Sequence, residues 1–354
     1  MAGGIGSRFW PLSTTNKPKQ FIDILDTGRS FIQQTFDRFK KIIPVENIYV
    51  VTNESYIDLT KVQLPELNPH QILTEAAMRN TAPCIAYATY KILSKNPDAN
   101  FVITPSDHLI TKEDTFHNVI NRGMEYTMYN QSLLTIGIKP SRPETGYGYI
   151  QADIKGELET GTIQRVKTFT EKPDLELANV FLKSGDFLWN SGTFIWKGST
   201  ITTAFESFLP EIAEKFIACK GTYYTDKEAE AVKEAYISCK SISIDYGIME
   251  KASNVSVYCS EPLGWSDIGT WGSLYEQSAL DEKGNALSNS DAFLYDSKNN
   301  IINLPKGKVA VIQGLEGYIV AQTENTLLIC KKEEEQNIKK FVLDVKIEKG
   351  EDFI

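Results

Sequence analysis

The stretch Gly3-Gly4-Ile5-Gly6-Ser7-Arg8-Phe9-Trp10-Pro11-Leu12-Ser13, followed by Lys17-Pro18-Lys19-Gln20-Phe21, decides how the start of this chain folds. Glycines let backbone N–H groups approach a bulky anion, because no Cβ atom stands in the way. Arg8 adds a planar cationic fork that suits phosphate oxygens, and Lys19 adds a point charge after the restricted Pro18. The stretch predicts a loop that wraps a polyphosphate, although a simple glycine-rich turn explains the fragment equally well on its own.

This loop differs from the two best-known phosphate-binding motifs. It lacks the Gly-Lys-Ser/Thr ending of a Walker P-loop. It also departs from G-x-G-x-x-G, because Trp10-Pro11 interrupts the helix that should follow the glycines. A loop of this kind normally follows a buried strand, whereas only Met1-Ala2 precede it here, so we expect that an N-terminal strand is missing.

The composition is ordinary for a globular protein. Its 354 residues allow one large or two modest domains, with 42% hydrophobic and 23% charged residues. A formal net charge of −9 argues against a general nucleic-acid binder, which usually carries a basic excess. The five cysteines form no C-x-x-C pair, which predicts reduced thiols and a cytoplasmic protein. No apolar run approaches the length of a membrane span, so we expect no membrane partner.

Helical and strand patterns alternate over the first part of the chain. A helix is expected over residues 30–39, with Ser30 as its N-cap. Further helices are expected over 82–93, over 116–129 and within 200–239, and strands over 47–52, 101–104 and 133–138. Such alternation predicts a doubly wound α/β sheet that binds its ligands at the carboxyl ends of the strands.

From about Asp291 the pattern changes to short strands separated by turn residues. The strands are expected over 292–295, 300–303, 309–312, 317–322 and 326–330, and a charged helix over 331–340. This pattern predicts a small β domain like a left-handed β-helix. We therefore expect a first domain at residues 1–284 and a second at residues 285–354.

The string Gly-Gly-x-Gly-x-Arg-x-Trp-Pro-x-Ser, with Pro-Lys-Gln-Phe after it, resembles the signature of the sugar-1-phosphate nucleotidylyltransferases. Its Trp-Pro and Lys-Gln-Phe are similar to those of the mannose-1-phosphate guanylyltransferase branch, and further motifs follow in that family's order. The resemblance implies a Rossmann-like doubly wound mixed sheet, here with the small C-terminal β domain. It also implies Mg²⁺-dependent transfer of GMP from GTP to mannose 1-phosphate, which gives GDP-mannose and pyrophosphate.

Two aspartates are the expected Mg²⁺ ligands. Asp107 follows the expected strand 101–104, and a carboxylate at a strand tip can hold a hard cation together with substrate phosphates. A helix cap or a turn explains Asp107 equally well from these residues alone. In the resembling family, Pro-x-Asp-His carries one metal-binding Asp, here Asp107, and Trp-x-Asp-x-Gly-x-Trp provides the second, here Asp267.

The resemblance assigns the nucleotide to two segments. Arg8 and Lys19 are expected to bind the triphosphate and the leaving pyrophosphate, and the other expected contacts from the loop are Gly3, Gly4, Gly6 and Ser7. A second string is similar to the family's base and ribose pocket, where the expected contacts are Glu75, Arg79, Asn80 and Thr81. A carboxylate can accept hydrogen bonds from guanine N1–H and N2–H₂. Asn80 or Thr81 suits the cap of the following helix as well.

The sugar is assigned to three further motifs. In the family, Gly146-Tyr147-Gly148 lines the sugar site, Glu171 and Asn190 contact hydroxyls, and Lys172 holds the sugar phosphate during catalysis. From the residues alone, the glycines also suit a bulge, the Glu-Lys pair a surface ion pair, and Asn190 a turn. Asp245 is expected first as a helix N-cap or first-turn acid, and only second as a site residue.

Two alternatives stay open. The same fold can act on another sugar 1-phosphate, or it can serve as a non-catalytic, nucleotide-binding regulatory subunit. The two expected metal carboxylates, Asp107 and Asp267, count against the regulatory subunit, and the missing strand counts mildly for it. The expected partners are GTP and mannose 1-phosphate, without nucleic acid, and a homodimer is compatible with the sequence.

Overall fold

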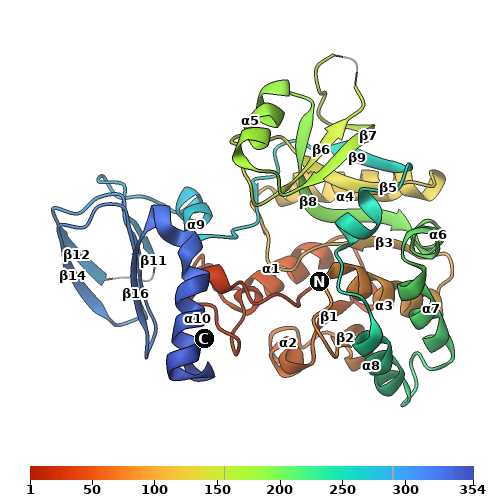
Figure 1. Cartoon of the computed structure of the whole chain (residues 1–354), viewed down its shortest axis with the longest axis horizontal. Coiled ribbons are helices and arrows are strands. Elements are labelled where there is room, and N and C mark those ends of the chain that lie inside the picture. Colours follow the sequence, from red (N-terminus) through yellow and green to blue (C-terminus); the bar gives the residue numbers. More distant parts are fainter. Residues whose placement is uncertain (155, 289–290) are drawn as a thin grey trace.

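The computed structural model describes residues 1–154, 156–288 and 291–354. Its larger part is built on a six-stranded sheet with the order β3-β8-β5-β9-β7-β6 (Figure 1). The strands are β3 (Asn100–Ile103), β5 (Leu133–Ile138), β6 (Gly148–Ala152), β7 (Thr162–Glu171), β8 (Phe187–Lys197) and β9 (Val255–Cys259). The β5–β9 pair is parallel and the other pairs are antiparallel, so the expected mixed α/β sheet is confirmed.

Helices cover both faces of this sheet because side chains alternate along each strand. On β5, Leu134 and Ile136 share a hydrophobic cluster with α4, whereas Leu133 belongs to the cluster that contains α3, α6 and α7. The helices are α1 (Phe31–Lys40), α2 (Ile57–Gln63), α3 (Thr81–Leu93), α4 (Glu113–Tyr129), α5 (Leu175–Ser184), α6 (Gly198–Phe208), α7 (Pro210–Ala218), α8 (Glu228–Ser238) and α9 (Trp271–Gln277). The helices expected over 30–39, 82–93 and 116–129 are therefore confirmed.

A second, two-stranded sheet lies beside the first. Its strands β1 (Val50–Asn53) and β2 (Ile72–Glu75) are parallel. The strand expected over 47–52 begins at Val50, because Val45–Asn47 form a 3₁₀ turn, and β2 was not anticipated. The chain's first residues lie between the two sheets, and Figure 1 marks the N-terminus between β1 and β3.

The C-terminal β domain consists of short strands that pair in parallel, except for the last pair, which is antiparallel. Its strands are β11 (Ala286–Ser288), β12 (Asp291–Tyr295), β13 (Ile301–Asn303), β14 (Val309–Gln313), β15 (Tyr318–Gln322) and β16 (Leu327–Lys331). β13 pairs in parallel with both β11 and β15, and β12 pairs in parallel with β14. Each strand expected from the sequence is present within two residues of its expected bounds.

The terminal helix begins later than expected. Residues Lys332–Asn337 form 3₁₀ turns, and the helix α10 extends over Ile338–Lys349. The expected start at 331 is therefore wrong. Within the 3₁₀ segment, Glu335 accepts a hydrogen bond from the Gly272 N–H at the start of α9, at 2.8 Å. This contact satisfies one of the backbone donors that a helix leaves open at its N-terminus.

The β domain packs directly on the glycine-rich loop. Phe9 and Trp10 share one hydrophobic cluster with Ile301 of β13 and Ile338 of α10. The Trp10 indole N–H also donates to the carbonyl of Phe353, at 2.7 Å. The loop and the C-terminal domain therefore form one structural unit, in which the domain supports the loop's apolar side.

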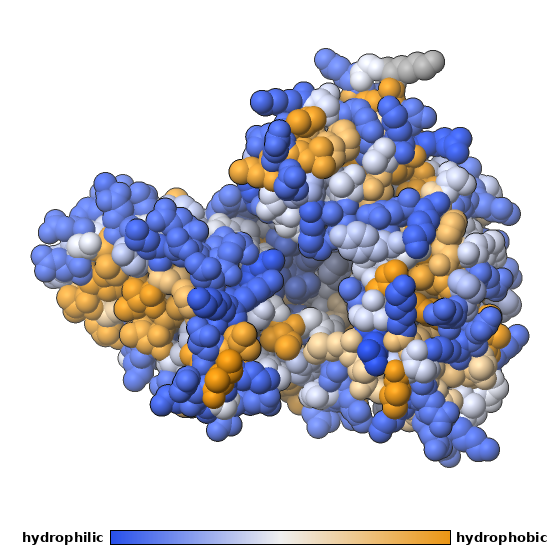
Figure 2. Space-filling view, in the orientation of Figure 1, coloured by the Kyte–Doolittle hydropathy of each residue, from blue (hydrophilic) through white to orange (hydrophobic). Residues whose placement is uncertain are grey.

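Other features of the structure lie outside the glycine-rich loop. Figure 2 shows apolar side chains on the outer face of the β domain, and the exposed members there include Phe293, Tyr295, Val309 and Val311. None of the described helices has both the length and the apolar character needed to cross a bilayer. All five cysteines lie within the described residues, and they are free thiols there.

Candidate active site

One pocket, called the phosphate pocket below, is lined by most of the residues that the phosphate and metal motifs singled out, although Gly3 and Gly4 are not among them. It has a volume of about 290 Å³ and is lined by Gly6, Ser7, Arg8, Lys19, Asp107, His108, Asp267, Gly269 and Lys339. The short strands β4 (Leu109–Ile110) and β10 (Trp265–Ser266) pair antiparallel, with Leu109 opposite Ser266. Because each aspartate lies next to this ladder, the pairing places Asp107 and Asp267 on the same pocket.

The glycine loop is shaped by its contact with Lys19. Gly6 has a φ of 74°, which L side chains rarely adopt, and a Cβ atom here would lie 2.5 Å from the Lys19 Cβ. The Lys19 N–H donates to the Ile5 carbonyl at 3.0 Å, and the Ser13 hydroxyl donates to the Gly6 carbonyl at 2.5 Å. The loop therefore closes on itself around the lysine, and glycine is required where the two segments meet.

Lys19 joins the two aspartates. Its side chain is buried, and its Nζ donates to Asp107 Oδ2 at 3.0 Å and to the backbone carbonyl of Asp267 at 2.6 Å. Burial pushes the pKa of Asp107 upward, but the attraction of Lys19 and its hydrogen bond outweigh this and hold the pKa below its ordinary value. Asp107 is therefore an anion at neutral pH, and Lys19 is placed to balance its charge.

Arg8 has an unsatisfied donor at this pocket. Its Nε is buried and has no hydrogen-bond partner in the described part of the chain. Buried polar groups are nearly always paired, so an orphaned guanidinium N–H at a pocket points to a missing anionic partner. A phosphate oxygen is a suitable acceptor.

Asp267 is held by its neighbours. Its Oδ1 accepts hydrogen bonds from the Tyr147 hydroxyl at 2.7 Å and from the Gly269 N–H at 2.9 Å. The Tyr147 ring is packed edge-on against Trp189 and Trp265, with centroid separations of 5.2 and 5.1 Å. Tyr147 therefore connects the residues of the expected sugar site to the Asp267 carboxylate of the phosphate pocket.

The residues of the expected sugar site lie together on neighbouring strands. Gly148 pairs opposite Glu171 across β6 and β7, and a Cβ atom at Gly148 would clash with the Glu171 carboxylate. Lys172 forms an ion pair with Glu171, and its N–H donates to the Tyr147 carbonyl at 3.2 Å. The first glycine, Gly146, instead donates its N–H to Glu144 at 3.0 Å. These contacts bring the Gly-Tyr-Gly and Glu-Lys motifs side by side.

Asn190 lies within strand β8, where its amide is fixed from two sides. Its Oδ1 accepts from the Thr135 hydroxyl at 3.0 Å, and its Nδ2 donates to Asp245 Oδ1 at 2.9 Å. Asp245 begins a π-helical turn over Asp245–Met249, and the N-cap of this turn is Ile244. Burial and the nearby Glu171 charge raise the pKa of Asp245 to about 6. Asp245 is a first-turn acid, as expected, and its contact with Asn190 also makes it a neighbour of the expected sugar residues.

The expected base segment lies outside the phosphate pocket. Arg79 donates to the backbone carbonyls of Tyr236 and Ile237 at the end of α8, and the Thr81 hydroxyl accepts from the Ile244 N–H. Asn80 is the N-cap of α3, where its side chain accepts from the next N–H. The alternative of a helix cap is therefore confirmed for Asn80, and the contacts of this segment with guanine stay a prediction.

Glu75 connects the base segment to the glycine loop. It ends β2 with 5% of its surface exposed, and a Cβ atom at Gly3 would lie 2.8 Å from its Oε2. The neighbouring glycine Gly4 has open space around it. Burial raises the pKa of Glu75 to about 7, against the opposing effects of the Tyr236 hydroxyl and the N-terminal ammonium group.

The raised pKa of Glu75 makes stability depend on pH. The unfolded carboxyl releases its proton near pH 4.5 and the folded one near 7, so the free energy of unfolding falls as pH rises between these values. We expect Glu75→Gln to abolish this loss, which amounts to roughly 2 to 3 kcal/mol. Denaturant unfolding at pH 5 and pH 8 measures the effect. The exposed Glu54 provides a Glu→Gln control, and an unchanged pH dependence in Glu75→Gln would contradict the prediction.

The sequence did not predict the role of Lys339. This lysine of α10 lines the phosphate pocket, and the positive charge of Arg8, together with burial and Lys172, lowers its pKa. Lysines in a charged helix are ordinarily solvated, which is why its role was not anticipated. A usable signal was the apolar spacing Ile338, Phe341, Val342 and Val345, which places one face of α10 against the cluster that holds Phe9 and Trp10.

Comparison with known proteins adds an independent line of information. The family described as nucleotidyl transferase matches residues 1–284, and the MannoseP isomerase/GMP-like beta-helix domain matches residues 291–344. A mannose-1-phosphate guanylyltransferase of Klebsiella pneumoniae is 34% identical over 348 residues, which cover 97% of this chain and 72% of the relative. A mannose-1-phosphate guanylyltransferase of Salmonella montevideo is 36% identical over 360 residues, which cover 100% of this chain and 74% of the relative.

A solved structure shows the same architecture. The crystal structure described as mannose-1-phosphate geranyltransferase from Thermus thermophilus superposes with a TM-score of 0.87 at 25% identity, and the match covers 98% of each chain. Both domains are therefore arranged as in that protein. With these matches and the convergence of its phosphate and sugar motifs, the chain belongs to the nucleotidyl transferase family and, within it, to the mannose-1-phosphate guanylyltransferases.

Proposed function

We propose that this protein transfers GMP from GTP to mannose 1-phosphate and releases pyrophosphate. The observation that carries the proposal is the pocket that unites Arg8, Lys19, Asp107 and Asp267, in which the lining residue Arg8 also has a buried Nε without a hydrogen-bond partner among the described residues. The names of the relatives supply the sugar and the base. The free thiols are consistent with a cytoplasmic enzyme.

The chemistry needs positioning and charge stabilisation more than proton transfer. The phosphate of mannose 1-phosphate is already ionised, so it can attack the α-phosphorus of GTP in line without a general base. Lys172 holds the attacking phosphate of mannose 1-phosphate. The ion pair with Glu171 orients the lysine beside the residues of the expected sugar site. Arg8 and Lys19 bind the triphosphate and stabilise the charge that develops on the leaving pyrophosphate.

The donors of the pocket suit Mg²⁺. Asp107 and Asp267 are carboxylates that line the same space, and the described residues contain no group of three or more His, Cys, Asp or Glu side chains placed to hold a metal. Two carboxylates that leave positions for phosphate oxygens and water match the preference of this hard cation. When bound, Mg²⁺ would neutralise charge on the phosphates.

Pyrophosphate release tests the proposed function. Purified protein is incubated with GTP and mannose 1-phosphate, with and without Mg²⁺, beside ATP, UTP and other sugar 1-phosphates. Release that needs GTP, mannose 1-phosphate and Mg²⁺ supports the proposal. Release with another sugar alone would assign a different substrate. If folded protein binds GTP but releases nothing with any sugar, the result would count against the proposal and favour the regulatory alternative or the expected missing strand.

Lys339 gives a specific prediction for nucleotide binding. We expect Lys339→Ala to raise the KM for GTP by about 5- to 10-fold, because one charge-assisted phosphate contact is lost. Its side chain is exposed and contributes little to packing, so kcat and the melting temperature should change little. Initial rates at varied GTP measure the effect.

The next residue provides the matched control. Lys340 is exposed on the same helix and does not line the phosphate pocket, so Lys340→Ala should leave the KM for GTP unchanged. Equal KM values for the two variants would show that α10 contributes only general positive charge.

A further inference from the structure

His108 also lines the phosphate pocket, and a hydrogen bond fixes which of its ring nitrogens carries the proton. The ring lies edge-on to Trp265, with the two ring centroids 5.5 Å apart. The Trp265 indole N–H donates to His108 Nδ1 at 3.2 Å. Because an indole nitrogen can only donate, Nδ1 is the acceptor, and the proton of the ring is therefore on Nε2.

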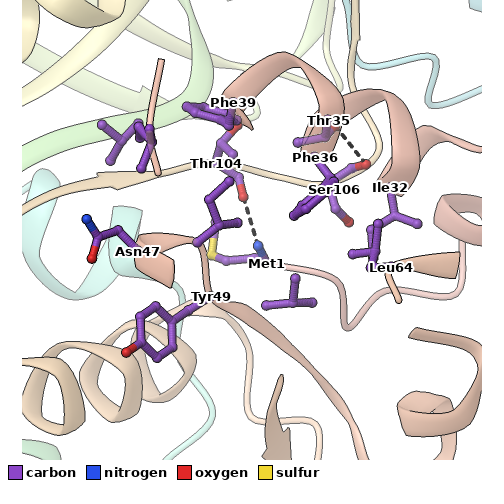
Figure 3. Close-up of a pocket in the computed structure, with 14 residues that line it drawn as sticks. Met1, Ile32, Thr35, Phe36, Phe39, Asn47, Tyr49, Leu64, Thr104 and Ser106 are labelled. Atoms are coloured by element: carbon purple, nitrogen blue, oxygen red, sulfur yellow. Dashed lines mark hydrogen bonds between the residues drawn. The ribbon is translucent and has the colours of Figure 1, made fainter. Parts of the chain in front are cut away.

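The backbone around His108 is held on both sides. Before it, the Thr35 hydroxyl of α1 donates to the Ser106 carbonyl at 3.1 Å, as Figure 3 shows. After it, Leu109 pairs with Ser266 across the β4–β10 ladder. The ring of His108 is therefore fixed in place by its backbone and by Trp265, as a group that binds a reacting substrate needs to be.

The Nε2–H of His108 is left for a ligand. It has no hydrogen-bond partner among the residues that the structure describes. The backbone of Gly192 lies beside the ring, and a Cβ atom at Gly192 would be 3.9 Å from His108 Cε1. Gly192 comes two residues after Asn190, so one of the expected sugar motifs lies close to this histidine.

His108 lies where the two halves of the site meet. On the triphosphate side it follows Asp107, whose Oδ2 accepts from Lys19 Nζ at 3.0 Å. On the sugar side, its partner Trp265 packs edge-on against Tyr147, with the ring centroids 5.1 Å apart. A donor at this junction faces the place where the sugar phosphate and the triphosphate come together.

We propose that His108 Nε2–H donates a hydrogen bond to a non-bridging oxygen of the α-phosphoryl group of GTP. The inference rests on the proposed function, because the α-phosphoryl group is the part that passes from the triphosphate to the sugar phosphate. The bond from the sugar phosphate oxygen to the α-phosphorus forms, and the bond to pyrophosphate breaks with its electron pair on pyrophosphate. His108 keeps its proton throughout.

A neutral donor suits this position. The Asp107 carboxylate repels an anionic phosphate oxygen that comes close to it, and a fixed N–H group offsets part of this repulsion without adding a charge. Because the ring is already oriented, the hydrogen bond can strengthen as charge develops in the transition state, with no cost of reorganisation.

A purely structural role would use the other nitrogen. If His108 only supports Trp265, then Nδ1 is the important atom and the Nε2–H is dispensable. The two roles therefore make opposite demands on the two ring nitrogens.

Amide side chains test the two nitrogens separately. The amide of asparagine reaches only the place of Nδ1, so His108→Asn keeps an acceptor for Trp265 and loses the outer donor. The amide of glutamine reaches the place of Nε2, so His108→Gln keeps the outer donor instead. We expect His108→Asn to lower kcat by about 10²-fold with the KM for GTP within about 3-fold, and His108→Gln to keep kcat within about 5-fold.

Initial rates of pyrophosphate release and the melting temperature of each variant measure these effects. His70→Asn is the matched control, because His70 is exposed and does not line the phosphate pocket. An unchanged kcat in His108→Asn, or a loss in His108→Gln as large as that in His108→Asn, would overturn the inference.

Nitrogen-15 NMR of the histidine rings tests the contact without turnover. The chain has three histidines, so the signals that disappear in His108→Gln identify this ring. We expect a protonated Nε2 in the free protein, and we expect GTP with Mg²⁺ to shift the Nε2 signal while that of His70 stays in place. An unmoved signal with GTP bound would overturn the inference, and so would the same shift with inorganic pyrophosphate alone, because the contact would then belong to the leaving group.

The two measurements separate this inference from the proposed function. If the unsubstituted protein releases no pyrophosphate with any substrate but GTP shifts the Nε2 signal, the proposed function fails and the contact of His108 with GTP is supported. If the protein is active and the Nε2 signal does not move, the function holds and the role of His108 is refuted.

Discussion

Replacing Lys19 by methionine is expected to lower kcat by about 10³-fold. Its Nζ joins the Asp107 carboxylate to the backbone carbonyl of Asp267, and its side chain is buried under the glycine loop. Methionine has a similar length but no charge, so the variant loses the cation that we propose binds the triphosphate. Steady-state pyrophosphate release at saturating GTP measures the effect.

The same substitution leaves Asp107 without its partner. Because the Asp107 side chain is one-third exposed (33%), we expect a stability loss of only about 1 to 2 kcal/mol, and the variant should still fold. Lys17→Met is the control, since Lys17 is exposed two residues earlier in the same loop. A kcat for Lys19→Met within a few-fold of the Lys17→Met value would remove Lys19 from the mechanism.

The phosphate loop shows what local sequence can predict. Three glycines, Arg8 and Lys19 within one short span favour an anion site, because glycine conformation and side-chain charge are local properties, but a simple glycine-rich turn explains the same fragment equally well. The prediction that Asp107 and Asp267 belong to one metal site also came from motifs. Their approach in space depends on the β4–β10 ladder, whose two-residue strands have no recognisable sequence pattern.

Contacts between distant segments were harder to predict. The Tyr147 hydroxyl reaches Asp267 across 120 positions of the chain, and Lys339 reaches the pocket only because α10 packs on Phe9 and Trp10. Neither contact has a local pattern, since each depends on how two domains or motifs pack. The start of α10 was missed for a related reason: the charges of residues 331–337 suit a helix, but Glu335 is used to bond Gly272 at the start of α9.

Replacing Asp267 by asparagine is expected to lower kcat/KM by about 10²- to 10³-fold and to raise the Mg²⁺ concentration needed for half-maximal rate. Asparagine has nearly the same shape, and its Oδ1 can still accept from the Tyr147 hydroxyl and the Gly269 N–H. The change therefore removes negative charge and leaves the local hydrogen bonds in place. Mg²⁺ titration of pyrophosphate release, beside thermal unfolding, separates a lost metal ligand from a damaged fold.

Tyr147→Phe is the matched control, because it changes the orientation of the Asp267 carboxylate without removing its charge. It removes the 2.7 Å hydrogen bond to Asp267 Oδ1 but keeps the ring that packs on Trp189 and Trp265. A carboxylate that is merely less well oriented should cost about 3- to 10-fold in kcat/KM, with little change in the Mg²⁺ requirement. If Asp267→Asn shows the same small loss and an unchanged Mg²⁺ requirement, then Asp267 orients Tyr147 and Lys19, and the metal is held by Asp107 and the phosphates.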